Sequence, residues 1–122
     1  FYAGAYADPT AADLVASYHA SIEPIVTRGG LPVVVQSLAM HAMPAAEKAA
    51  LYARICAPYP KLVGFELGRM FAPHGEIWND ETFARLLEIP QLVGSKHSSL
   101  DRGTELRRLH RRDRERPEFR VY

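Results

Sequence analysis

The chain lacks the features that mark secreted, membrane and nucleic-acid-binding proteins. Its single cysteine, Cys56, cannot form an internal disulfide and is expected as a buried, reduced thiol in a helix. No apolar run approaches the roughly 20 residues that span a bilayer, and the first residues lack the basic start of a signal peptide. A net charge of +1 gives no attraction to nucleic acid or to an anionic membrane. We therefore expect a cytoplasmic protein with neither kind of partner.

Motifs for metal ions and nucleotides are also missing. The five histidines show no H-E-x-x-H spacing and no pairing with cysteine, so no metal site is expected. No glycine-rich phosphate-binding turn of the G-x-G-x-x-G or G-x-x-x-x-G-K type follows an expected strand. The sequence therefore predicts no cofactor.

A short sequence motif occurs twice in the chain. Residues 60–66 and 90–96 share the pattern Pro-x-Leu-Val-Gly, and the two copies lie 96 − 66 = 30 residues apart. Each copy has the pattern of a buried strand that ends in a charged residue. A strand with its crossover helix takes roughly 30 residues, so the repeat predicts a β/α array.

Alternating strands and helices are predicted along the whole of residues 1–122, which form one domain. Strands begin near residues 2, 32, 62, 92 and 119, and the β-branched run after Leu31 is typical of a strand covered on both faces. This alternation predicts an α/β fold with a parallel sheet. It fits either an open doubly wound sheet or part of an eight-stranded barrel, and the absence of a phosphate-binding turn favours the barrel.

Helix boundaries follow from capping residues and prolines. The expected helices cover about residues 9–23 with Asp8 as N-cap, 44–57, a third segment capped by Asn79, and 100–116 capped by Ser98 or Ser99. In the last helix, Leu106 and Leu109 are expected to be buried. Residues 67–78 form an irregular loop, and a loop of this length is often functional.

Lys96 is the principal candidate for chemistry, because it ends the second copy of the repeat. The last residue of a strand in a parallel barrel emerges at the face that carries the active site. Partial desolvation lowers the pKa of an amine, and the deprotonated amine is the species that attacks carbonyl groups. The alternative is a lysine that only extends from the strand end into solvent.

Four segments carry a resemblance to a known family. Residues 89–99 resemble the segment that holds the Schiff-base lysine of the dihydrodipicolinate synthase and N-acetylneuraminate lyase family of class I aldolase-type barrels. Residues 4–13 are similar to the family's third strand and the helix start after it. Residues 80–87 are similar to the helix before the lysine strand, and residues 117–122 to the start of the next strand. Only the lysine segment is specific.

The resemblance implies a partial (β/α)8 barrel that comprises about strands three to seven. It also implies that an N-terminal part and a C-terminal part lie outside the 122 residues, and that the full-length protein is a homo-oligomer. Lys96 would then condense with the ketone of a 2-oxo acid such as pyruvate, and the imine would serve as an electron sink for making or breaking a carbon–carbon bond. The isolated 122 residues are expected to be inactive.

The other site residues depart from the family's pattern. The tyrosine acid/base expected near the end of the strand before the lysine strand is missing, since the chain reads Gly-Phe-Glu there. Glu66, the repeat equivalent of Lys96, is a candidate catalytic residue that would pair with the lysine or transfer protons, or else form a structural salt bridge. Candidate substrate contacts are Arg69 for a carboxylate, His41 and Ser98. The missing tyrosine keeps open a noncatalytic barrel homologue or binding module.

Arginines cluster near the C-terminus, with acidic residues interleaved among them. This pattern is typical of a salt-bridged solvent face. A surface for nucleic acid or an acidic partner remains the alternative, and its binding would depend steeply on salt.

Overall fold

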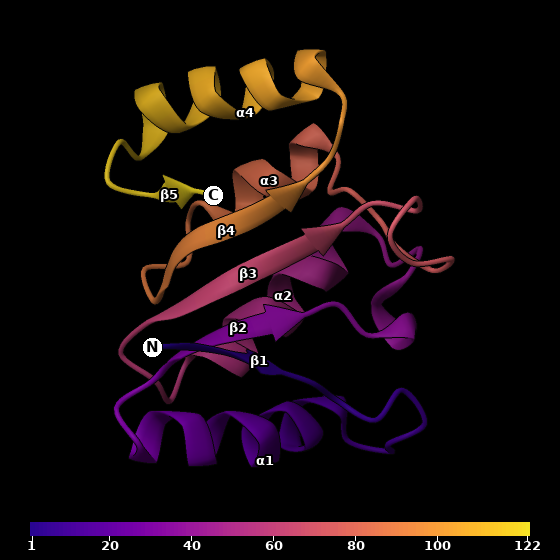
Figure 1. The fold of residues 1–122 in the computed structure, drawn as a ribbon, viewed down its shortest axis with the longest axis vertical. Helices are drawn as coiled ribbons and strands as arrows, with labels where there is room; N and C mark the ends of the chain where they lie inside the picture. Colours follow the sequence, from indigo (N-terminus) through magenta and orange to yellow (C-terminus); the bar gives the residue numbers. More distant parts are fainter.

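The computed structural model describes residues 1–122 as five parallel β-strands joined by helices (Figure 1). The α/β fold with a parallel sheet predicted from the sequence is therefore confirmed. The elements are β1 (Tyr2–Ala5), α1 (Leu14–Thr27), β2 (Leu31–Val35), the short 3₁₀ helix η1 (Leu38–Met40), α2 (Ala45–Cys56), β3 (Leu62–Leu67), α3 (Asp80–Leu86), β4 (Leu92–Ser98), α4 (Arg102–Glu115) and β5 (Arg120–Val121).

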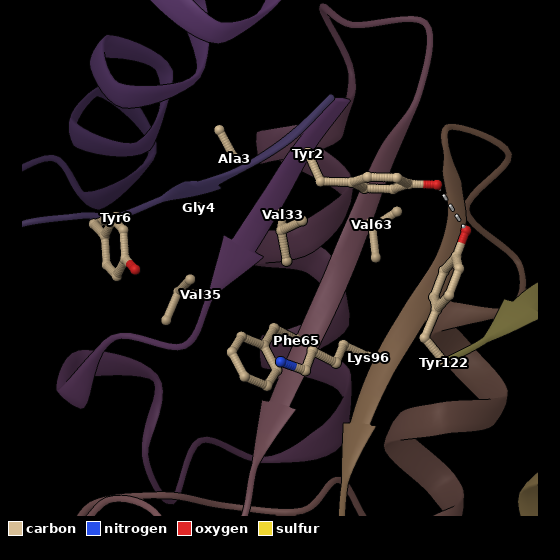
Figure 2. Close-up of a pocket in the computed structure, with 10 residues that line it drawn as sticks. All are labelled: Tyr2, Ala3, Gly4, Tyr6, Val33, Val35, Val63, Phe65, Lys96 and Tyr122. Carbon is tan, nitrogen blue, oxygen red and sulfur yellow. Dashed lines mark hydrogen bonds between the residues drawn. The ribbon is translucent and has the colours of Figure 1, made fainter. Parts of the chain in front are cut away.

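The strands lie in the sheet in the same order as in the sequence, from β1 to β5. A doubly wound sheet is defined by a point at which the strand order reverses. The strand order of this sheet has no such point. Each connecting helix packs against the next, from α1 through α2 and α3 to α4. Right-handed crossovers between consecutive parallel strands place their helices on one face of the sheet. The other face, called the open face below, carries no helix (Figures 1 and 2).

Helix α1 starts later and ends later than the sequence predicts. Asp8 does not cap the helix, because its carboxylate accepts hydrogen bonds from the backbone and hydroxyl of Thr10 and forms a separate turn. Asp13 caps the helix instead, accepting from the backbone of Ala16 at 3.0 Å. The helix then continues through Pro24, although proline removes one internal hydrogen bond.

Helix α4 also differs from the prediction in its cap and its buried face. Asp101 is the N-cap residue, whereas Ser98 belongs to β4 and Ser99 only accepts a bond from the backbone of Asp101. Leu106 is 53% exposed, so its predicted burial is wrong. The buried residue of this helix is Arg108, which is 1% exposed. Helices α2 and α3 begin close to their expected proline or cap, and Asn79 caps α3 as predicted.

The hydrophobic core lies between the sheet and the helices. It includes Tyr18 of α1, Tyr52 of α2 and Trp78, whose ring packs edge-on against Tyr52 at 5.6 Å between centroids. Cys56 is fully buried in this core, as predicted, and burial raises the pKa of its thiol to about 12. No helix has the length and apolar character needed to cross a bilayer.

Candidate active site

Lys96 lies on the open face of the sheet, in a pocket of about 390 Å³ (Figure 2). Its Nζ atom is 4.6 Å from the centroid of the Phe65 ring, so the amine rests on an aromatic face. The amine has no hydrogen bond or ion pair with any other residue of the chain. Of the three lysines in the sequence, it is the only one that lines this pocket.

The pocket around Lys96 is built from strand residues that share one level of the sheet. Val35 pairs with Phe65 across β2 and β3, and Phe65 pairs with Lys96 across β3 and β4. Tyr6 follows the last paired residue of β1, and Tyr122 follows β5. We call this set, which consists of Tyr6, Val35, Phe65, Lys96 and Tyr122, the Lys96 row; all five line the pocket.

A second level of the pocket lies toward the amino ends of the strands. Val33 pairs with Val63 there, and both side chains line the pocket below the Lys96 row. Tyr2 lies over Val63, and its hydroxyl is 3.4 Å from that of Tyr122 (Figure 2). The rings of Tyr2, Tyr122 and Phe65 thus give the pocket an aromatic lining, and the pocket stays open to solvent. Eight of its ten lining residues are hydrophobic.

Glu66 does not meet Lys96, although the repeat makes the two residues equivalent. The pairing of β3 with β4 shifts by one residue between Leu62 and Val63, so Lys96 lies opposite Phe65 and Glu66 lies opposite His97. Because side chains alternate along a strand, a shift of one residue moves them to the other face. The expected contact between Glu66 and Lys96 is therefore absent, and the structure corrects it.

Glu66 instead forms a buried cluster on the helix side of the sheet. Its carboxylate accepts two hydrogen bonds from Arg108, at 3.1 and 3.0 Å, and one from the Trp78 backbone at 2.9 Å. His97 also donates to it through Nδ1. The side chains of Glu66, Arg108 and His97 are at most 2% exposed. The salt-bridge interpretation of Glu66 is thus the one that its contacts match, with Arg108 as partner.

The remaining candidate residues lie at the carboxyl ends of the strands and are not brought together with Lys96. Ser98 is two residues beyond Lys96 in β4 and therefore on the same face of the sheet. Arg69 is exposed in the loop after β3 and forms no ion pair. His41 follows η1, and its Nδ1 atom lies 3.8 Å from the Glu76 carboxylate. No hydrogen bond or ion pair connects any of the three to the lysine.

A partly buried ion pair anchors the loop after β3. Lys48 of α2 is 1% exposed, and its amine donates to Glu76 at 2.6 Å. Glu76 also accepts a hydrogen bond from the Ala42 backbone at 3.3 Å. The loops after β2 and β3 are therefore joined beyond the carboxyl ends of the strands.

Sequence reasoning missed several residues of this region. Phe65 gave a signal, since it replaces the tyrosine expected from the resemblance, but its place beside Lys96 depends on the register shift. Arg108 gave none, because eight arginines crowd the C-terminal region and nothing in the pattern singles out the buried one. Four of these arginines pair with the interleaved acidic residues, as predicted: Arg102, Arg111, Arg112 and Arg116. Arg107 pairs instead with Asp80, and Arg108 with the buried Glu66.

The arrangement offers an exposed amine without polar partners in a largely apolar pocket. No three side chains of histidine, cysteine, aspartate or glutamate lie close enough together to bind a metal ion. No model of a known protein family matches the chain, and no curated protein matches it. The geometry of the site and the resemblance of its lysine segment therefore carry the functional argument.

Proposed function

We propose that the chain forms strands three to seven of a (β/α)8 barrel. Parallel sheets occur almost only with both faces covered, and here the helices cover one face alone. Closing the sheet with further strands would enclose the open face without adding helices to it. The sequential strand order and the helices on one side of the sheet support this proposal.

We further propose that the full-length protein is a Schiff-base lyase or synthase of the dihydrodipicolinate synthase and N-acetylneuraminate lyase type. The observation that carries this proposal is the unpaired amine of Lys96 on the open face, 4.6 Å from the Phe65 ring. The other two lysines fit the role less well. Lys48 is buried in its ion pair with Glu76, and Lys61 is exposed just before β3, at the opposite end of the strands.

In the proposed reaction, the Nζ lone pair attacks the ketone carbon of a 2-oxo acid, and loss of water gives an imine. The protonated imine withdraws electrons from the neighbouring carbon, so that a carbon–carbon bond there is made or broken. Lys96 is exposed on the open face, so its amine is within reach of a substrate. Ser98, on the same face, is the nearest of the proposed polar substrate contacts along the chain.

Borohydride trapping tests this function. It reduces the imine to a stable secondary amine, so full-length protein treated with pyruvate and borohydride should gain the mass of one reduced pyruvate. The Lys96→Ala variant should gain none. Lys61→Ala is the matched control, since it removes a lysine outside the pocket, and it should be labelled like the unaltered protein. An adduct that persists in Lys96→Ala would refute the assignment.

A noncatalytic binding protein is the second candidate. It is favoured by Phe65, which brings no phenol to the place beside Lys96, and by Glu66, which faces the helices. Such a protein would bind a 2-oxo acid without turnover, and its affinity would be the same in Lys96→Ala. Calorimetric titration of that variant with pyruvate distinguishes the two candidates, because an imine-forming site loses affinity with the amine.

A further inference from the structure

The side chains that line the pocket around Lys96 bear on which carbonyl compounds the site would accept. This inference rests on the proposed function. Besides Lys96, the Lys96 row consists of a valine, a phenylalanine and two tyrosines. Lys96 is the only charged residue that lines the pocket. The half of the site formed by β1 to β5 is therefore apolar and aromatic around the reacting amine.

The register shift removes polar groups from this wall. Glu66 and His97 are neighbours in sequence of Phe65 and Lys96, and both point to the helix side. Arg108 binds Glu66 there, so its charge is also on the far side of the sheet. A substrate next to Lys96 thus meets none of these three groups.

The aromatic character would persist in a complete barrel. The interior of such a barrel is filled by layers of side chains, and the lower level with Val33 and Val63 belongs to that packed core. The Lys96 row lies one level closer to the carboxyl ends of the strands, where the active site of a barrel opens. The row is therefore the part of the wall that a substrate touches.

We propose that the substrate of Lys96 is a 2-oxo acid whose side group is apolar and of aromatic size. A ring on that side group can stack against Phe65 or pack against Val35 and the rings of Tyr6 and Tyr122. A hydroxylated side group would lose its hydrogen bonds to water. It could regain them only from the hydroxyls of Tyr2, Tyr6 and Tyr122, of which those of Tyr2 and Tyr122 already contact each other.

Competition between carbonyl probes tests the proposal in the full-length protein. The probes are 2-oxo-4-phenylbutyrate, pyruvate and hydroxypyruvate, each trapped with cyanoborohydride, and the measurement is the concentration that gives half-maximal labelling of Lys96. We expect half-maximal labelling by the phenyl compound at a concentration roughly tenfold lower than by pyruvate. Hydroxypyruvate should need a higher concentration than pyruvate.

Two variants locate the preference. Phe65→Leu keeps the wall apolar but removes the ring, so the advantage of the phenyl compound should fall while pyruvate labelling is retained. Phe71→Leu is the matched control, because Phe71 is 58% exposed in the loop after β3 and lies outside the pocket. Its labelling pattern should equal that of the unaltered protein.

The outcomes separate this proposal from the proposed function. If pyruvate or hydroxypyruvate labels Lys96 at concentrations as low as the phenyl compound does, the imine chemistry stands and the substrate class is wrong. An unchanged preference in Phe65→Leu would also overturn the proposal. If none of the three probes labels Lys96, the proposed function fails, and the substrate class fails with it.

Discussion

Glu66 and Arg108 form a two-point ion pair in which both side chains are fully buried, 42 residues apart in the sequence. The guanidinium group also lies over the Phe83 ring, with its central carbon 4.5 Å from the ring centroid. The pair joins β3 to α4, and through His97 it reaches the strand that carries Lys96. It therefore fixes the helix side of the sheet directly behind the pocket.

Removing the arginine of this pair should be strongly destabilising. Arg108→Ala leaves the Glu66 carboxylate buried without its main counter-charge, and breaking a buried pair in this way typically costs about 3–5 kcal/mol. Urea unfolding of the full-length protein, followed by fluorescence, measures the loss. The control is Arg107→Ala, since Arg107 lies on the same helix but pairs with Asp80 at the surface. Its cost should be at most about 1 kcal/mol; equal losses would contradict the account.

Removal of Lys48 and removal of Glu76 should lower the free energy of unfolding by different amounts. Lys48 is 1% exposed, whereas the Glu76 side chain is 29% exposed. Glu76→Ala strands a buried cation and should cost on the order of 3 kcal/mol. Lys48→Met keeps the volume and leaves a carboxylate that water can reach, so its cost should be clearly smaller. Denaturant unfolding of the two variants checks the order, and a larger cost for Lys48→Met would contradict it.

Cys56 should resist alkylation in the folded protein. Burial raises the pKa of its thiol to about 12, and only the thiolate is nucleophilic. Iodoacetamide at pH 8 should label Cys56 only after denaturation. The folded-state pKa lies above the unfolded one, so the associated stability is complete below pH 9 and declines as pH rises above it. Rapid labelling of the native protein would show that the core around Cys56 opens.

The 122 residues on their own should self-associate. Phe1, Tyr2 and Tyr6 are 69%, 57% and 63% exposed, and β1 and β5 are open sheet edges. Exposed apolar patches and unpaired strand edges both promote association. Sedimentation of the isolated chain should therefore detect oligomers or aggregates. An activity assay of the same sample should detect no lyase activity. A monomer with a cooperative thermal transition would contradict the proposal that further strands cover the open face.

The strands were the part of the fold that the sequence predicted best. The β-branched run from Leu31 to Val35 and the Pro-x-Leu-Val-Gly repeat each became a strand within about two residues of the expected start. Apolar runs with prolines and caps at their ends are local signals, so they can be read without knowledge of the neighbours. Helix α1 was misplaced because Asp8 has two possible roles, a helix cap or a turn, and only the contacts with Thr10 decide between them.

The site was predicted less completely because its geometry depends on strand register. Lys96 was predicted as the last residue of its strand, whereas β4 continues for two more residues to Ser98. The predicted pairing of Lys96 with Glu66 was wrong, since the one-residue shift at Leu62 and Val63 places Phe65 opposite the lysine instead. Such a shift follows from packing between two strands and leaves no mark in either repeat copy. The burial of Arg108 has the same cause, because its guanidinium group pairs with the Glu66 carboxylate, which is turned toward the helices.

The central claim is that the amine of Lys96 captures a 2-oxo acid, and the most direct test is the position of a trapped adduct. Full-length protein is reduced with cyanoborohydride in the presence of pyruvate, digested after acidic residues and mapped by mass spectrometry. The peptide from Ile89 to Asp101 contains Lys96 as its only lysine, and we predict the adduct in this peptide. An adduct confined to the peptide with Lys48 and Lys61, or no adduct at saturating pyruvate, would contradict the account.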